Sequence, residues 1–407
     1  MSRNVKASKK LFFAFFRLRG HLLFCTLTAF SLILLLRHSD TAVLHMNRGL
    51  RLCAGTVIPS LFPFMVLSDL IVSGGCGLLL GRLCEHPMRR LFGISGAGAS
   101  ALILGLICGF PTGTKTAVAL CRHGQISPAE LSRLICFCNI PSAAFLINVV
   151  GVSLFENRRF GILLYVICLI AALCSAWLLQ RIRPLETHPH FSPSTDEKIQ
   201  VKMFTHAVTS AAGAMLYVCA YVVFFTAVIG TLGELLKPFS PTQAFTAALF
   251  GIFELSGGVM EASAIEDGTV AGCLTAFLCG WSGISVHLQI LSLCDELPAA
   301  DAPHIRPYLL CKLFQGLLCA LLCGCVLYFF PSFRPLPSRL SSETVLSTVG
   351  SSQNALFIHA SLIILLLLLL LTRKQKNDKF CTVRHTVTYH TCEGGAKDEL
   401  RNLHGNL

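Results

Sequence analysis

Residues 105–116 read GLICGFPTGTKT and place three glycines, a proline and a lysine inside an otherwise apolar stretch. Gly and Pro interrupt a helix and leave backbone N–H and C=O groups without partners. At membrane depth such groups persist only where they are buried in protein or line a wet cavity. Residues 251–258 read GIFELSGG and interrupt a second apolar run with Glu254. Each is followed by another break, CNIPS at 138–142 and CGWSG at 279–283. This shared order of interruptions predicts two halves of similar layout around one site.

The composition of the 407-residue chain is typical of a membrane protein, since 54% of its residues are hydrophobic and 13% are charged. Soluble domains carry about 25% charged residues. Several stretches reach the length of about 20 apolar residues that a spanning helix needs. Because lipid offers backbone groups no partner, these stretches should be helical. The sequence therefore predicts an all-α, polytopic transmembrane helix bundle of about eight to ten spans, with two Gly-broken or re-entrant hairpin segments in a pseudo-repeat.

Basic residues lie at the ends of the apolar stretches. The net charge is +12, from 33 Lys and Arg against 21 Asp and Glu. Pairs such as Arg89 and Arg90, or Arg181 and Arg183, flank apolar stretches, as is typical of membrane boundaries. A nucleic-acid interface would collect these charges on one folded surface. We therefore expect the lipid bilayer as a partner and no nucleic acid.

Shifts in composition divide the chain into two apolar halves with polar and terminal segments around them. The first 39 residues hold no acid, and no small-residue cleavage site follows the apolar run at 22–36, which predicts an uncleaved first helix with a cytoplasmic N-terminus. The expected segments are a basic N-terminus and first transmembrane helix at 1–44, a first half at 45–180, a polar linker at 181–206, a second half at 207–331, a Ser/Pro loop at 332–354, a C-terminal transmembrane helix at 355–372 and a basic soluble tail at 373–407.

Most of the 20 cysteines lie in apolar runs, with no CxxC pair among these, and buried free Cys behaves as a small hydrophobe. The Cys and His residues of the tail match no common zinc-finger spacing. The sequence also holds no HExxH or GxSxG motif, and no paired acids with a set of metal ligands. We therefore expect no metal, no cofactor, no catalytic residue and no enzymatic activity.

Lys115 and Glu254 are the charged residues placed closest to the breaks. An unpaired ammonium is costly in an apolar stretch. Lys115 is therefore interpreted as a contact to a solute or counter-ion, or as a helix-end residue that reaches the interface. Glu254 is interpreted as a proton or cation ligand, or as an acid paired internally, with Lys115 as a candidate partner. Asp69 and Glu261 lie nearer to helix ends, and we expect a structural and a water-facing role for them.

The remaining polar residues near the breaks each have two interpretations. His287 can bind a carboxylate or accept a proton, or it can be a hydrogen-bonded core residue. Asn139 and Ser142 either line a cavity or join helices through hydrogen bonds worth about 0.6 kcal/mol on average. Half-helix N-termini at the breaks would direct positive dipole ends at an anionic group. The predicted substrate-binding residues are Pro111, Thr112, Gly113, Lys115, Asn139, Ser142, Glu254, Ser256, Gly257, Ser282, Gly283, Ser285, His287 and Gln289.

These motifs together resemble a known family. They are PSLFPF at 59–64, GFPTGTK at 109–115, CNIPS at 138–142, ELSGG at 254–258 and GISVHLQ at 283–289. Their order and spacing over residues 45–330 resemble the YlbJ (SpoVV) family of sporulation integral membrane proteins. That family belongs to the nucleoside-recognition, or Gate-domain, membrane proteins, which are similar to concentrative nucleoside transporters. The resemblance implies that residues 45–180 and 207–331 are two Gate-like halves.

The resemblance further implies the cell membrane or outer forespore membrane of a spore-forming bacterium, and movement of dipicolinic acid toward the spore. Dipicolinate is a flat aromatic dianion, to which Lys115, His287 and two half-helix N-termini would offer positive charge and N–H donors. We therefore expect a sporulation-associated transporter of a small anionic solute that works by alternating access, with H⁺ or Na⁺ as coupling ion. The alternatives are a nucleoside-type solute and a non-transporting membrane protein of spore-envelope assembly. A homo-oligomer is a further candidate assembly.

Overall fold

The computed structural model describes residues 22–185 and 201–335, apart from residues 24, 75, 296, 299 and 300. Every regular element in these ranges is a helix, which confirms the expected all-α class. The expected C-terminal transmembrane helix at 355–372 and the basic tail at 373–407 lie outside the described residues. So does most of the expected polar linker, at 186–200.

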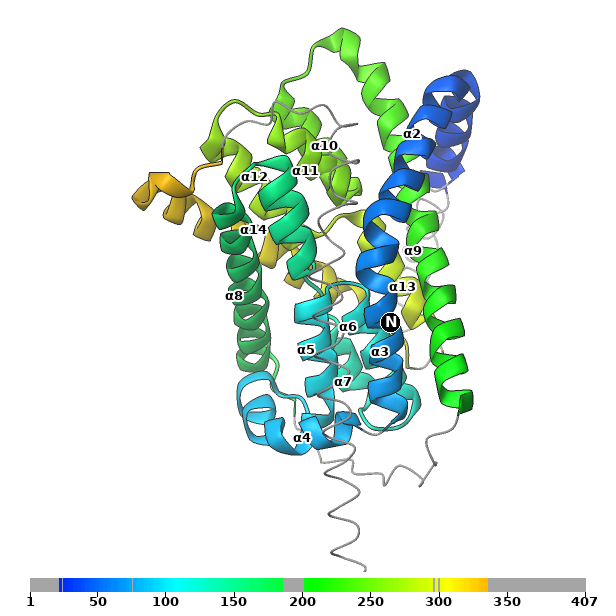
Figure 1. The fold of residues 1–407 in the computed structure, drawn as a ribbon, viewed down its shortest axis with the longest axis vertical. Helices are drawn as coiled ribbons and strands as arrows, with labels where there is room; N and C mark the ends of the chain where they lie inside the picture. Colours follow the sequence, from blue (N-terminus) through cyan, green and yellow to red (C-terminus); the bar gives the residue numbers. More distant parts are fainter. Residues whose placement is uncertain are drawn as a thin grey trace, which may run out of the picture.

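The helices follow one another in the order shown by the colours of Figure 1. In the first half they are α2 (Ser39–Leu52), η1 (Cys53–Val57), α3 (Ile58–Ser73), α4 (Cys76–Pro87), η2 (Met88–Phe92), η3 (Gly96–Gly98), α5 (Ala99–Cys108), α6 (Thr112–Arg122), α7 (Pro128–Leu134), η4 (Phe145–Leu154) and α8 (Arg158–Ile182). In the second half they are α9 (Val201–Leu236), η5 (Lys237–Phe239), α10 (Gln243–Phe253), α11 (Leu255–Ser263), α12 (Gly268–Trp281), α13 (Ile284–Cys294), α14 (Ile305–Phe329) and η7 (Pro331–Phe333).

Among the described residues, four helical stretches are long and apolar enough to cross a membrane: Arg158–Ile182, Lys202–Phe239, Gly268–Cys294 and Ile305–Phe329. Two bent pairs qualify if each is one span: Cys25–Arg37 with Ser39–Gly55, bent by 101°, and Gly81–Phe92 with Gly96–Cys108, bent by 98°. This part of the chain thus holds four to six candidate spans, against eight to ten expected for the whole. Part of the difference arises because the arms of the broken segments are too short to cross a bilayer alone, and the expected helix at 355–372 lies outside the described residues.

Two groups of long helices flank the broken segments (Figure 1). On one side α2 and α3 pack along α9, and α3 and α9 bury a shared cluster of apolar side chains. On the other side α14 packs against α12 and α8. The hairpins α5–α6 and α10–α11 lie between these groups, so that their turns are enclosed by protein, where freed backbone groups can find partners.

The two hairpins turn at residues suited to a sharp reversal. Gly109 follows α5 with a φ of 84°, in the left-handed region that favours glycine. A Cβ on Gly109 would also lie 2.5 Å from the backbone nitrogen of Ser142. In the second hairpin the extended residue Glu254 separates α10 from α11, and its carboxylate caps the N-terminus of α11.

Both hairpins bring their arms together at a pair of glycines. A Cβ on Gly113 in α6 would lie 2.9 Å from the Cα atom of Gly105 in α5. In the second hairpin a Cβ on Gly258 in α11 would overlap the backbone of Gly251 in α10. Only glycine allows helix backbones to approach this closely. The same packing device therefore occurs in both halves of the chain.

We expect Gly258→Ala to lower the melting temperature of the purified protein. Overpacking of a close crossing typically costs about 1–3 kcal/mol. Gly213→Ala is the matched control, because a Cβ on Gly213 in α9 would meet no atom within 4 Å. Alanine favours a helix over glycine by about 1 kcal/mol, so this control should melt at the same temperature or slightly higher. Equal melting temperatures for both variants in detergent would contradict the close crossing.

Candidate functional site

Three cavities follow one another along α9. The lower cavity has a volume of about 460 Å³ and lies beside the first half of α9. The central cavity, of about 70 Å³, lies at its middle, and the upper cavity, of about 420 Å³, lies beside its second half. The α9 residues that line these cavities include Met203, His206, Ala207, Ser210 and Ala214 below, Val218 and Val222 in the centre, and Thr226, Ile229, Gly230 and Gly233 above.

The cavity-lining residues of α9 form a single stripe. Most are three or four positions apart, which places them on one face of the helix. At 1.5 Å per residue, the distance from Met203 to Gly233 is about 45 Å, which exceeds the roughly 30 Å of a hydrocarbon core. The stripe of cavity-lining residues is therefore longer than a hydrocarbon core is thick.

The two hairpins enter this series from opposite ends. The lower cavity is lined from α6 by Lys115, Val118, Ala119 and Arg122. The upper cavity is lined from α10 and α11 by Gln243, Thr246, Phe250, Gly257 and Met260. The turns of the two hairpins, at Phe110 and at Glu254, meet in the central cavity. The two hairpins are thus arranged in opposite orientations along α9.

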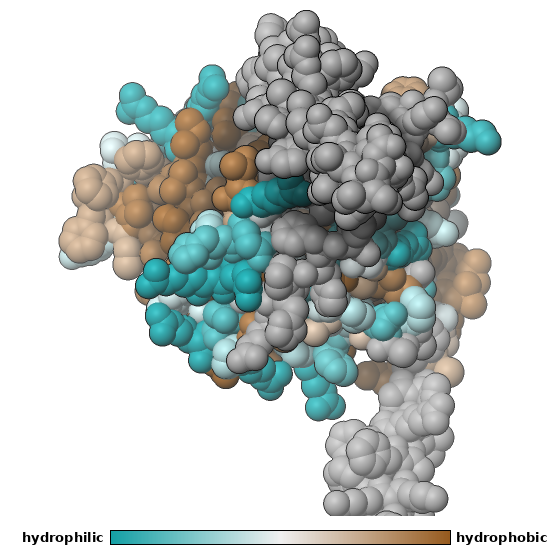
Figure 2. Space-filling model, turned by 90° about the horizontal axis from the view of Figure 1, so that it is seen from below, coloured by the Kyte–Doolittle hydropathy of each residue, from teal (hydrophilic) through white to brown (hydrophobic). Residues whose placement is uncertain are grey.

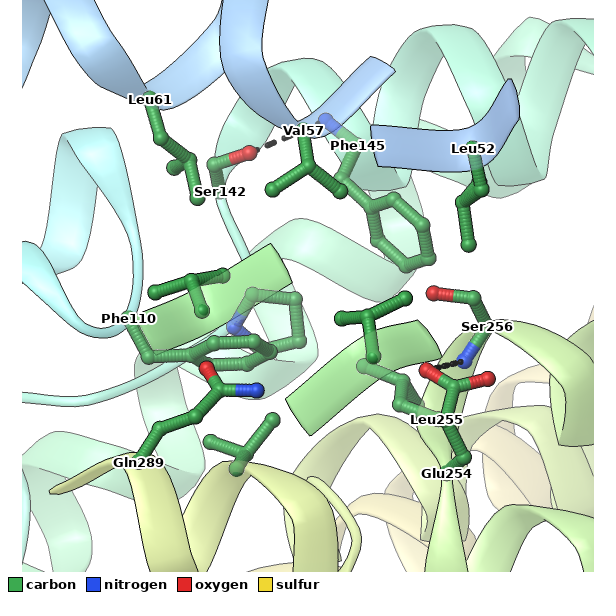
Figure 3. Close-up of a pocket in the computed structure, with 14 residues that line it drawn as sticks. Leu52, Val57, Leu61, Phe110, Ser142, Phe145, Glu254, Leu255, Ser256 and Gln289 are labelled. Atoms are coloured by element: carbon green, nitrogen blue, oxygen red, sulfur yellow. Dashed lines mark hydrogen bonds between the residues drawn. The ribbon is translucent and has the colours of Figure 1, made fainter. Parts of the chain in front are cut away.

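The central cavity combines a few polar side chains with an apolar wall. Four predicted site residues line it: Ser142, Glu254, Ser256 and Gln289. Gln289 and the ring of Phe110 lie on one side of the cavity, and Glu254 and Ser256 lie on the other (Figure 3). The rest of the wall comprises Leu52, Val57, Leu61, Pro141, Phe145, Val218, Val222, Leu255 and Val286. Small-molecule sites usually have volumes of about 300 Å³ or more, so the central cavity is too small to hold a solute in this conformation.

Glu254 connects the central and upper cavities, since it lines both. Its Oε1 accepts a hydrogen bond from the backbone N–H of Ser256 at 3.0 Å, and its Oε2 accepts one from Gly257 at 2.6 Å. These two donors belong to the first turn of α11, whose N–H groups have no partner within the helix. The hairpin therefore fixes a carboxylate at the boundary between two cavities, and pairs it with a helix N-terminus rather than with Lys115.

In the first half, backbone and side-chain contacts join the hairpin turn to the break at 138–142. The N–H of Phe110 donates to the carbonyl of Ile140 at 3.0 Å. The Oδ1 of Asn139 accepts from the backbone N–H of Thr114 at 3.2 Å and from its hydroxyl at 3.0 Å. Asn139 thus holds the first turn of α6 in place and does not line any of the three cavities. Pro111, Thr112 and Gly113 form the buried start of α6 beside this contact.

Lys115 lines the lower cavity, whereas Glu254 lines the central and upper cavities. Its Nζ is 2.8 Å from Oδ2 of Asp69, in an ion pair whose side chains are 8% and 12% exposed. Asp69, for which we expected a structural role, is therefore its partner. The other ionisable residues that line this cavity are basic: Arg122, His123, Lys202 and His206. Seen from the lower end, hydrophilic side chains gather on this face of the molecule (Figure 2).

In the second half, α12 and α13 are separated by Ser282 and Gly283, both with positive φ, of 77° and 86°. Both are buried, and the carbonyl oxygens of Gly251 and Phe253 lie within 3.4 Å of where a Cβ on Gly283 would be. The break therefore packs directly against the second hairpin. In the first turn of α13, Ser285 accepts a hydrogen bond from the Nε2 of Gln289 at 3.2 Å, which orients Gln289 toward the central cavity.

His287 points away from the three cavities. Its Nδ1 is 2.7 Å from the hydroxyl of Tyr308 in α14, and its ring makes an edge contact with Trp281. His287 and Tyr308 are both buried. This arrangement matches the hydrogen-bonded core residue, the second of the two interpretations of His287.

Sequence reasoning missed a polar pair in α14. The side chains of Lys312 and Gln315 are buried, and Nζ of Lys312 donates to the backbone oxygen of Asn139 at 2.8 Å. Nε2 of Gln315 donates to the backbone oxygen of Cys136 at 2.8 Å. The signal was available, because a Lys and a Gln three residues apart interrupt the apolar run of α14. Because both residues lie near Arg306 at the start of that helix, they resemble the polar residues of a membrane flank, and this signal was overlooked.

Comparison with known proteins identifies one relative of similar length. In an alignment of 332 residues, the chain is 27% identical to the sporulation integral membrane protein YlbJ of Bacillus subtilis (strain 168), and the match covers 73% of this chain and 79% of that protein. No protein-family model matches the chain. No solved structure matches it.

Proposed function

Because this chain belongs to the YlbJ family of sporulation integral membrane proteins, we propose that it is a secondary transporter of a small anionic solute. It is an integral membrane protein of a spore-forming bacterium. The proposed solute is dipicolinic acid, and the proposed location is the outer forespore membrane. Transport would proceed by alternating access around the central cavity.

The observation that carries this proposal is the series of three cavities along one face of α9. Two cavities of more than 400 Å³ lie at opposite ends, and the small central cavity lies between them where the hairpin turns meet. A protein that opens one hairpin at a time would connect the centre to one side and then to the other. A packing role in envelope assembly would not require two wide cavities that approach a common polar centre.

The charges of the lower cavity support an anionic solute. Lys115, Arg122, His123, Lys202 and His206 line it with one acid, Asp69. A cleft lined mainly by one sign of charge raises the local concentration of the opposite ion. A dianion such as dipicolinate would therefore concentrate at the lower end of the path.

The polar groups of the centre favour a second candidate, a nucleoside-like solute. Glu254 and Gln289 are hydrogen-bonding groups that suit hydroxyls and amides, and Phe110 offers an aromatic wall. The two candidates differ in charge, so that one assay separates them.

Solute counterflow in proteoliposomes tests the proposal. Vesicles that contain the purified protein are loaded with unlabelled dipicolinate and diluted into labelled dipicolinate, and a parallel set uses uridine. We expect transient accumulation of labelled dipicolinate above the level in protein-free vesicles. If uridine shows counterflow and dipicolinate does not, the transported solute is a nucleoside and not an anion. Absence of counterflow with both solutes would contradict this transport function and favour envelope assembly.

A further inference from the structure

Lys312 is a buried cation that the three cavities do not use. Its side chain is 0% exposed, in α14 between α8 and α12. Nζ donates to the backbone oxygen of Asn139 at 2.8 Å and to Oε1 of Gln315 at 3.0 Å. The first acceptor belongs to the break that follows α7. In secondary transporters, carbonyls freed by such breaks coordinate the coupling cation. In this chain an ammonium group occupies that position.

No carboxylate of the described residues forms an ion pair with Lys312. The titratable groups near Lys312 are the imidazole of His287 in α13 and the thiols of Cys138 beside the break, Cys168 in α8, Cys279 in α12, and Cys311 and Cys319 in α14. The phenol of Tyr308, four residues earlier in α14, is hydrogen-bonded to His287. A charged Lys without an acid partner is unfavourable at membrane depth, whereas a neutral amine is much less so. An acid partner would favour the charged form and hold the proton on the amine, so the proton is released more easily from a site that has none among the described residues.

The proton on Lys312 has a direct mechanical link to the central cavity. Its acceptor residue, Asn139, holds the first turn of α6 through Thr114. The next residue, Ile140, accepts the N–H of Phe110, whose ring lines the central cavity. Charge-assisted hydrogen bonds are about twice as strong as neutral ones. Protonated Lys312 thus holds the break and the hairpin turn more tightly than the neutral amine does.

We propose that Lys312 is the proton-binding group that couples transport to a proton gradient. This proposal rests on the transport function proposed above. Lys312 is buried in this conformation, so the step needs a movement of the break that admits water to Nζ. The lone pair of the amine then accepts H⁺ from water on one side of the membrane, and the ammonium returns it to water on the other. The ammonium form binds the break at 138–142 more tightly than the neutral amine does. Binding or release of the proton therefore shifts the equilibrium between the conformations of the hairpin. Since the ammonium occupies the cation position, Na⁺ does not drive transport.

Two measurements on the same proteoliposomes test the coupling, with labelled dipicolinate as the probe. Counterflow without an ion gradient reports transport itself, and accumulation under an imposed pH or Na⁺ gradient reports coupling. For the unmodified protein we expect about tenfold more accumulation with an inward proton gradient than without one, and no effect of Na⁺. Lys312→Met should keep counterflow within about threefold and lose the proton-driven accumulation.

Lys312→Arg separates proton binding from a purely structural charge. An Arg side chain stays charged in proteins, so it would restore a structural cation and could not release the proton. We therefore expect Lys312→Arg to lose proton-driven accumulation as well. Arg159→Met is the control, because Arg159 is an exposed cation at the start of α8 that lines none of the three cavities, and we expect this variant to remain proton-driven.

Several outcomes would overturn this inference. Proton-driven accumulation by Lys312→Met or by Lys312→Arg would exclude Lys312 as the coupling group. Where neither variant folds, the unmodified protein still decides, because accumulation driven by Na⁺, or indifferent to the pH gradient, contradicts proton coupling. In each of these cases the unmodified protein would still show counterflow. Loss of counterflow in the unmodified protein would instead remove the transport function on which the inference rests.

Discussion

Replacing Glu254 by Gln is expected to reduce uptake about tenfold or more, while the protein still reaches the membrane at a normal level. Glu254 lines both the central and the upper cavity, and its carboxylate accepts the N–H groups of Ser256 and Gly257. A Gln side chain has one acceptor oxygen instead of two, so one donor of the first turn of α11 loses its partner. Loss of an N-cap contact costs about 1 kcal/mol, which lowers the melting temperature without unfolding the protein.

Two further variants separate the capping role of Glu254 from its place in the cavity. Asp caps a helix well and keeps the charge, but it withdraws the carboxylate by one methylene. Glu254→Asp should therefore keep the melting temperature and still lose most uptake. Glu266→Gln, at an exposed acid beyond the end of α11, should behave as the unmodified protein does. Normal uptake by Glu254→Gln at equal protein level would show that this carboxylate does not take part in transport.

Replacing Lys115 by Ala is expected to have the second large effect, with a loss of uptake of about tenfold or more. Lys115 is the most deeply placed cation of the lower cavity, and its ammonium pairs with Asp69 at 2.8 Å. Lys202→Ala is the matched control, since it removes the same charge from the exposed rim of the same cavity. Uptake by the control should fall by about threefold at most, because exposed charges are screened by salt.

Lys115→Ala also leaves Asp69 without its partner, and breaking a buried pair can destabilise a protein by about 3–5 kcal/mol. The double variant Lys115→Ala with Asp69→Asn removes both charges and should restore the melting temperature. We expect it to restore stability and not uptake, because the cation itself is needed for the solute. If the double variant recovers uptake together with stability, the role of Lys115 is structural.

The breaks in the apolar pattern were predictable from the sequence, because Gly, Pro and charged residues are conspicuous in an apolar run. Glu254 was placed at a break and is found there as a helix cap that faces two cavities. Ser142, Ser256 and Gln289 were likewise predicted as site residues and line the central cavity. These predictions need only local information, since each depends on how a residue interrupts its own helix.

The arrangement of the broken segments in space was not predictable in the same way. Lys115 and Glu254 each interrupt an apolar run, which led us to place both at one site, yet the structure places them in different cavities. Their partners, Asp69 and the N-terminus of α11, follow from packing between helices. For the same reason the partner of His287 in α14 was not predictable, because no pattern along α13 identifies which helix covers it. Local periodicity defines the elements, and packing decides which side chains meet.

If the hairpin turns close a path along α9, the lower and upper cavities must open to opposite sides of the membrane. Single cysteines at Ser210, Ser256 and Thr226 would probe the lower, central and upper cavities, in a functional chain whose own cysteines have been replaced. With a membrane-impermeant thiol reagent, we predict that position 210 reacts from one side only and position 226 from the opposite side only. Position 256 should react slowly from either side until solute is added. Reaction of positions 210 and 226 from the same side would contradict the account.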